Sequence, residues 1–102
     1  WETAPLVSTL PDDFADIVNR FADHLELRIT ELQTAWDEGD FDKIAEVAHW
    51  LKGAGGTVGF HEFTEPASRL EEFAREADKA AVEHAIKEVS GLAARVQPCQ
   101  VS

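Results

Sequence analysis

The 102-residue sequence contains no methionine or tyrosine, a single cysteine and only nine basic residues. The lone Cys99 cannot form a disulfide within the chain and fits a reducing compartment such as the cytoplasm. No apolar run approaches the roughly 20 residues of a membrane span, and the first residues lack the basic start and apolar stretch of a signal peptide. We therefore expect no membrane contact by this chain. Because it does not begin with Met, we expect it to be part of a longer polypeptide.

Basic charge and metal-binding patterns are also scarce. Twenty acidic residues outnumber the nine basic ones and give a formal net charge of -11. Such a surface repels nucleic acid and anionic lipid, so neither is a predicted partner. No two of the four histidines have the i, i+3 or i, i+4 spacing that places two metal ligands on one helix face. No glycine-rich phosphate loop follows a strand. The sequence therefore predicts no metal site and no nucleotide site.

What the sequence does contain is helical periodicity, with apolar residues every three or four positions and no alternating Val/Ile/Thr segment. The first stripe starts at the acidic Pro11–Asp13 and ends before Gly39, a residue suited to a helix stop. A second stripe follows Asp40, a suitable N-cap, and closes at Gly59. The side chains expected to face the core from these two helices are Phe14, Ile17, Val18, Phe21, Leu25, Ile29, Leu32, Trp36, Phe41, Ile44, Ala48, Leu51, Gly55 and Val58.

Two further helices are predicted in the second half. One starts with Thr64 as N-cap, which leaves Pro66 in the first turn where its missing N–H costs little, or starts nearer Phe60 with a slight distortion. The last runs from Ala81 to Val96, and Pro5–Leu10 could add a short helix at the front of the chain. The side chains expected to face the core from these two helices of the second half are Phe63, Ala67, Leu70, Phe73, Ala74, Ala77, Val82, Ala85, Ile86, Val89, Leu92, Ala93 and Val96.

Short connections between long amphipathic helices favour antiparallel neighbours. We therefore predict an all-α fold, an antiparallel up-down four-helix bundle. The length of the chain fits one domain over residues 1–102, with the bundle at about residues 12–97 and a short tail at each end.

The segment Ala48–Phe60 carries the chemistry, since it reads Ala-His-Trp-Leu-Lys-Gly-Ala-Gly-Gly-Thr-Val-Gly-Phe. His49 follows a core position by 100°, so its ring is predicted to project outside the bundle. Lys52 lies one turn further on, and Gly53 at i+4 leaves space beside the ring. A neutral imidazole nitrogen is a nucleophile near pH 7, and phosphoryl transfer needs room for in-line approach and nearby positive charge. This register therefore predicts a phosphoryl acceptor.

The stretch Ala48-His49-x-Leu51-Lys52-Gly53, with Gly59 downstream, resembles the motif of the histidine-containing phosphotransfer (HPt) family. The resemblance implies a phosphorelay intermediate in which His49 accepts a phosphoryl group from a receiver-domain aspartate and passes it to another receiver. It also implies that Lys52 gives electrostatic support and that Gly53 gives steric clearance.

Further expectations follow from the same resemblance. Some members place Gln and Arg from the next helix near the histidine, and the matching positions here are Glu71, which departs from Gln, and Arg75. The domain is expected to bind no ATP or cofactor and to be no enzyme by itself, with Mg²⁺ belonging to the partner receiver. We expect a cytoplasmic monomer, the C-terminal module of a hybrid sensor kinase that could itself be membrane-bound.

The receiver is predicted to dock on the face around the histidine, at Asp42, Ala45, Glu46 and Gly56. Two alternatives stay open. One is an interaction module without chemistry, which would not need the register of His49, Lys52 and Gly53. The other is a histidine kinase dimerisation domain, which usually has an acidic residue after the histidine and builds its bundle from two chains.

Overall fold

The computed structural model describes residue 10 and residues 12–96. The short helix expected over Pro5–Leu10 lies outside these residues except for Leu10, as do Cys99 and the expected end of the bundle near residue 97. Over these residues the structure has two short 3-10 helices and four α-helices: η1 Asp12–Phe14, α1 Ala15–Glu38, α2 Phe41–Thr57, η2 His61–Phe63, α3 Thr64–Arg75 and α4 Lys79–Ala94.

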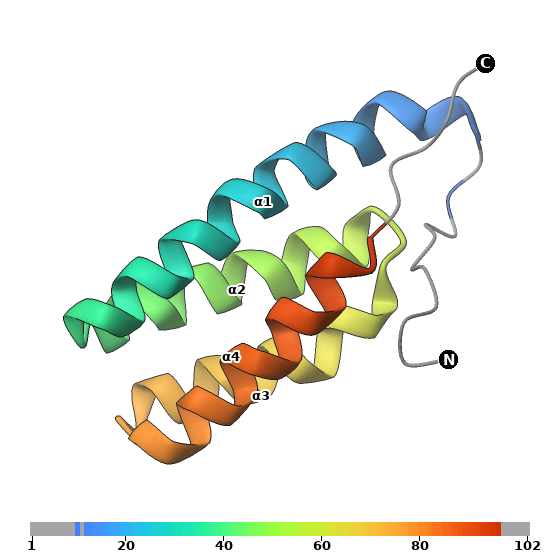
Figure 1. Ribbon diagram of the computed structural model, residues 1–102. Coiled ribbons are helices and arrows are strands. Elements are labelled where there is room, and N and C mark those ends of the chain that lie inside the picture. The colour runs from blue at the N-terminus through green and yellow to red at the C-terminus, as the bar shows by residue number, and fades with distance from the viewer. Residues whose placement is uncertain (1–9, 11, 97–102) are drawn as a thin grey trace.

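The four α-helices form an antiparallel up-down bundle, as the periodicity predicted (Figure 1). α1 packs against α2 and α4, and α3 packs against the same two helices, so the four lie in cyclic order. The contact between α2 and α3 is the most extensive, and that between α1 and α4 is the least extensive of the four neighbouring pairs. Within the described part of the chain, no helix is long and apolar enough to cross a bilayer.

The boundaries of α2 depend on residues that the sequence pattern singled out. Gly39 takes a left-handed conformation with φ 70°, which ends α1. The side chain of Asp40 then accepts a hydrogen bond from the backbone N–H of Lys43 at 3.1 Å and so caps α2. At the other end Gly59 has φ 86°, a conformation that turns the chain out of α2 toward η2. Pro66 lies in the first turn of α3.

The link between α3 and α4 corrects the predicted boundaries there. α3 ends before Ala77, which was expected in the core but is exposed with φ 54°. The side chain of Asp78 accepts a hydrogen bond from the backbone N–H of Ala81 at 3.2 Å. This cap starts α4 two residues earlier than predicted, and α4 also ends two residues before Val96.

The end of η1 and the first turn of α1 give a second correction. Phe14 and Ile17, both expected in the core, are 42% and 47% exposed. The 24 residues of α1 span about 36 Å, whereas the 17 residues of α2 span only about 26 Å. The start of α1 therefore extends past its neighbour α2 (Figure 1). Phe14 and Ile17 are left partly uncovered there, whereas Ala15 and Val18 beside them are buried.

An aromatic cluster closes the core where α1, α2 and η2 meet. The ring of Phe21 stacks on those of Trp50 and Phe60, with both centroid distances 5.5 Å, and contacts Phe63 edge-on at 6.3 Å. Gly55 lets the backbone of α2 approach this cluster, because a Cβ added there would lie 3.2 Å from Cβ of Phe63. The position of α2, which carries the candidate site, is thereby set by aromatic packing on its inner side.

Candidate functional site

His49 projects from α2 on the side away from the core. Its side chain is 69% exposed, while its neighbours Val47, Ala48 and Leu51 are buried. This follows from the 100° turn per residue, since the three buried side chains cover the inner half of the helix. The imidazole is therefore held at the surface by a helix whose own position is set by the core.

A carboxylate from α3 gathers three groups of the site. Oε2 of Glu71 lies 3.2 Å from Nδ1 of His49, and Oε1 accepts a hydrogen bond from Nζ of Lys52 at 3.1 Å. Arg75, one turn further along α3, donates from Nη2 to Oε2 at 2.8 Å. The structure thus brings together His49, Lys52, Glu71 and Arg75, although they come from two helices and Glu71 is 22 residues from the histidine.

Glu71 is the one buried charged residue in the described part of the chain, with 8% of its surface exposed. It follows Leu70 in the buried stripe of α3 and so points along the edge that packs against α2. The pKa of its carboxyl is lowered to about 2, mainly by the hydrogen bond from Arg75 and further by Lys52, against the opposing effect of burial. The side chain is therefore a carboxylate at any pH near neutrality.

The ionised state of Glu71 determines which nitrogen of His49 is available. A carboxylate can only accept hydrogen bonds, so the proton of a neutral imidazole is assigned to Nδ1, which donates to Oε2. Nε2 then carries the lone pair. The contact also restrains the ring of an otherwise exposed side chain. The site consequently presents a nucleophilic nitrogen with a fixed partner behind it and positive charge beside it.

The two glycines on the outer side of α2 leave space around the ring. A Cβ added at Gly53 would meet nothing within 4 Å, and one added at Gly56 would meet only Oγ1 of Thr64, at 3.9 Å. Gly53 lies one turn beyond His49 on the same face. No side chain projects from α2 at these two positions, so a partner could approach the imidazole closely.

The predicted docking residues do not all reach the surface. Asp42 and Glu46 are exposed, and Glu46 forms an ion pair with Lys43 at 3.6 Å. Gly56 is half-buried. Ala45 is only 6% exposed although it lies one turn before His49 on α2, so its short side chain is covered by tertiary packing and the expectation that it presents a surface to a partner is wrong.

Trp50, the residue after the histidine, is held between two side chains of α1. One face stacks on Phe21, and the guanidinium carbon of Arg28 lies 5.2 Å from the ring centroid. Arg28 also forms an ion pair with Glu31 at 3.2 Å. The tryptophan thus anchors the histidine-bearing turn of α2 to α1.

A family model for the Hpt domain matches residues 16–98. The chain belongs to the Hpt domain family. Hpt domains act by histidine phosphotransfer in phosphorelay signalling, interact with receiver domains of response regulators and have no kinase activity of their own. Comparison with curated proteins and with solved structures gave no match.

In this Hpt domain, most of what the sequence reveals about the site lies in the segment Ala48–Phe60, which contains His49. The family resemblance pointed to Glu71 and Arg75 without showing that they approach His49; the structure places Glu71 against the imidazole and Arg75 against Glu71. The exposed apolar pair Phe14 and Ile17 was missed, because periodicity assigned both to the core. Within the described residues, no group of three His, Cys, Asp or Glu could hold a metal ion.

Proposed function

We propose that His49 is the phosphoacceptor of this Hpt domain, taking a phosphoryl group from the aspartate of one receiver domain and passing it to a second receiver. The observation that carries the proposal is the exposed imidazole whose Nδ1 is held by the buried carboxylate of Glu71. An exposed histidine without a role would not need a buried, charged partner, because burying a carboxylate is unfavourable unless it is paired.

The transfer step follows from this arrangement. The lone pair on Nε2 attacks phosphorus, an N–P bond forms, and the P–O bond to the receiver breaks with the aspartate leaving as a carboxylate. Nδ1 keeps its proton, so the phosphorylated ring is cationic and Glu71 lies against it. Attack by the aspartate of the second receiver reverses these steps. No side chain of this domain has to remove a proton.

Lys52 and Gly53 support the same reaction in different ways. Lys52 is tied to Glu71 but is still 36% exposed, so its ammonium can turn toward the oxygens of the transferred group. When Lys52 turns toward those oxygens, the guanidinium of Arg75 remains paired with the carboxylate of Glu71. Gly53 leaves open the space that an incoming receiver would occupy. The domain itself binds no cofactor in this scheme, and Mg²⁺ belongs to the pocket of the receiver.

We place the docking face on the outer side of α2, with Asp42 and Glu46 at its rim and Gly53 and Gly56 near its centre. Surface charges at such a rim set orientation and association rate more than affinity. The exposed Phe14 and Ile17 extend this face onto α1, since Ile17 lies one turn from Phe21, whose ring stacks on Trp50. We expect a transient interface of at most about 1,200 Å² in total. The proposed docking face thus comprises Phe14, Ile17, Asp42, Glu46, Gly53 and Gly56.

A further part of the proposed function concerns the oligomeric state and the parent protein. We propose a cytoplasmic monomer that serves as the C-terminal module of a hybrid sensor kinase. The monomer is supported by the bundle itself, because a single chain supplies all four helices, whereas a kinase dimerisation domain needs two chains. A measured obligate dimer would favour that alternative.

The decisive experiment is incubation with a receiver domain that carries labelled phosphate. Label should move to the wild-type chain, be lost in acid and survive in base, as expected of an imidazole phosphate. His49→Gln should abolish labelling, while His84→Gln, a substitution at another exposed histidine, should leave it unchanged. Nitrogen-resolved NMR of the labelled protein should show the N–P bond at Nε2.

Two results would contradict the proposal. Label persisting in His49→Gln would remove the histidine from the reaction. A wild-type chain that binds receivers but never takes up label would leave a pure interaction module, the other alternative.

A further inference from the structure

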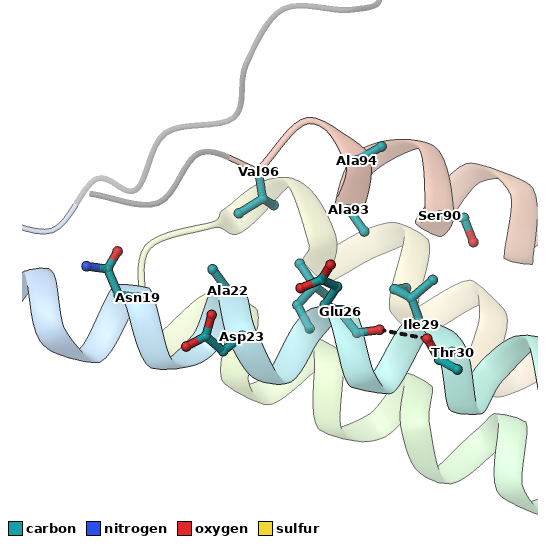
Figure 2. A pocket seen from close by; sticks show the side chains of 11 residues that line it. Asn19, Ala22, Asp23, Glu26, Ile29, Thr30, Ser90, Ala93, Ala94 and Val96 are labelled. Atoms are coloured by element: carbon teal, nitrogen blue, oxygen red, sulfur yellow. Dashed lines mark hydrogen bonds between the residues drawn. The ribbon is translucent and has the colours of Figure 1, made fainter. Parts of the chain in front are cut away.

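An open groove of about 620 Å³ runs between α1 and α4, away from the α2–α3 pair that holds the histidine site (Figure 2). Its floor is apolar and includes Ala22 and Ile29 of α1 and Ala93 of α4, with Val96 at one end. On α1 the lining extends from residue 19 to residue 30, which corresponds to about 16 Å or three helical turns. The groove is thus long enough for a helix of about three turns.

The charges along this groove have one sign. Asp23 and Glu26 are exposed acidic residues on the α1 side, and no Lys or Arg lines the groove anywhere in the described part of the chain. Arg95 follows a lining residue but lines a different hollow, beside Glu88. The chain as a whole carries a net charge of -11. Apolar floor and acidic side together favour a ligand that is apolar on one face and positively charged next to it.

A polar atom at the groove adds a second observation. Oγ of Ser90 is buried and has no hydrogen-bond partner among the residues that the structure describes. Figure 2 shows its side chain pointing from α4 toward α1. A buried hydroxyl usually finds a partner, so this atom marks the α1–α4 contact as less completely satisfied than the rest of the core.

We propose that the α1–α4 groove binds a basic amphipathic helix of a partner protein, about three turns long. Its apolar side chains would cover Ile29 and Ala93, and its Lys or Arg side chains would face Asp23 and Glu26. This goes beyond phosphoryl transfer, because the groove shares no residue with the His49 site and lies between a different pair of helices.

Charge also distinguishes this ligand from other occupants. Residues 1–9 and 97–102 contain no Lys or Arg, so neither of these two segments supplies basic side chains to complement the groove. A second copy would bring another net charge of -11, and nucleic acid or anionic lipid would be repelled.

The test uses the full 102-residue chain and a labelled synthetic helix of about 14 residues, or about four turns, made of Leu and Lys with one apolar face. A Leu/Glu peptide of the same pattern serves as the control ligand. Fluorescence anisotropy should show binding of the Leu/Lys peptide alone. The changes in amide chemical shift that the peptide causes in the wild-type chain, measured by NMR, should be confined to residues 19–30 and 90–96.

A matched pair of variants separates the groove from general attraction. Asp23→Lys with Glu26→Lys should weaken binding at least about tenfold. Glu72→Lys with Glu76→Lys, exposed sites on α3 and at its end, should weaken it much less. Both pairs change the net charge from -11 by 4 units, to -7. Melting curves check that each variant is folded.

Several outcomes would overturn the proposal. Equal weakening by both pairs, shifts outside the groove, or no binding would each do so. NOE contacts in the free chain from residues 1–9 or 97–102 to Ala22 or Ala93 would mean that the chain fills its own groove. Concentration-dependent dimerisation with shifts at the same residues would make a second copy the occupant.

Discussion

The α2–α3 contact and the α1–α4 contact lie on opposite sides of the bundle. They differ in how closely their helices pack. On the side of α2 and α3, Gly55 lets α2 approach Phe63 of η2, which leads directly into α3, and the buried charge of Glu71 has three partners. Between α1 and α4 the helices leave an open groove, and the buried hydroxyl of Ser90 has no partner among the described residues.

The difference shows which side of an Hpt domain needs a fixed geometry. In the proposed reaction His49 and Lys52 lie on α2 and depend on Glu71 of α3, so a small shift between these helices would change every distance in the site. No group of the site lies on α4, and the α1–α4 contact can stay looser without moving the histidine. Substitutions on the two sides should therefore differ in size and even in sign.

The largest expected difference concerns deletion of apolar side chains. Leu70→Ala, at a fully buried position of α3, should lower the free energy of unfolding by about 2–5 kcal/mol. Ile29→Ala, at a partly buried position on the groove floor, should lower it by only about 1–2 kcal/mol, because water already reaches that site. Urea denaturation of both variants measures this. Equal losses would mean that the α1–α4 side is packed as well as the other.

The glycines of α2 should respond to alanine with opposite signs. Gly55→Ala puts a Cβ 3.2 Å from Phe63, and this overpacking should destabilise the domain by about 1–3 kcal/mol despite alanine's better helix propensity. Gly53→Ala adds a methyl group in open space and should stabilise it by up to about 1 kcal/mol. Thermal melts of the two variants provide the comparison. A stabilising Gly55→Ala would show that the contact with Phe63 has room to spare.

The buried carboxylate should give a distinct dependence on pH. Because the folded pKa of Glu71 is about 2, against an ordinary value of 4.5, its stabilisation is fully present above pH 4.5 and is lost as the pH falls toward 2. Glu71→Gln should cost about 1–2 kcal/mol at pH 7 and remove this part of the acid dependence. Urea titrations from pH 7 to about pH 2 test the prediction, with the exposed Glu72→Gln as control. Parallel curves for both variants would contradict it.

The smallest effect is expected in the groove. Ser90→Ala removes the buried hydroxyl, which has no partner among residues 10 and 12–96, and should raise the free energy of unfolding by up to about 1 kcal/mol. Ser68→Ala, at an exposed position of α3, reports the gain from helix propensity alone. A Ser90→Ala gain no larger than that of Ser68→Ala would indicate that the hydroxyl is already satisfied.

Most of the fold could be predicted from the sequence, because the helices are strongly periodic and their ends carry residues with defined roles. Gly39 and Asp40 are next to each other and fix the end of one helix and the start of the next. Prediction failed at Asp78, whose capping role was overlooked, and at Ile17. Periodicity says which side of a helix is apolar, but it does not say whether a neighbouring helix is long enough to cover it.

The candidate site divides in the same way. The sequence by itself determined that His49, Lys52 and Gly53 share the outer side of one helix, since 3.6 residues per turn fixes their relative directions. Only the tertiary structure decided that Glu71 joins them, because the rotation and register of α3 against α2 depend on how the buried side chains of both helices fit. Tertiary packing also decided that Ala45 is covered and that a groove stays open between α1 and α4.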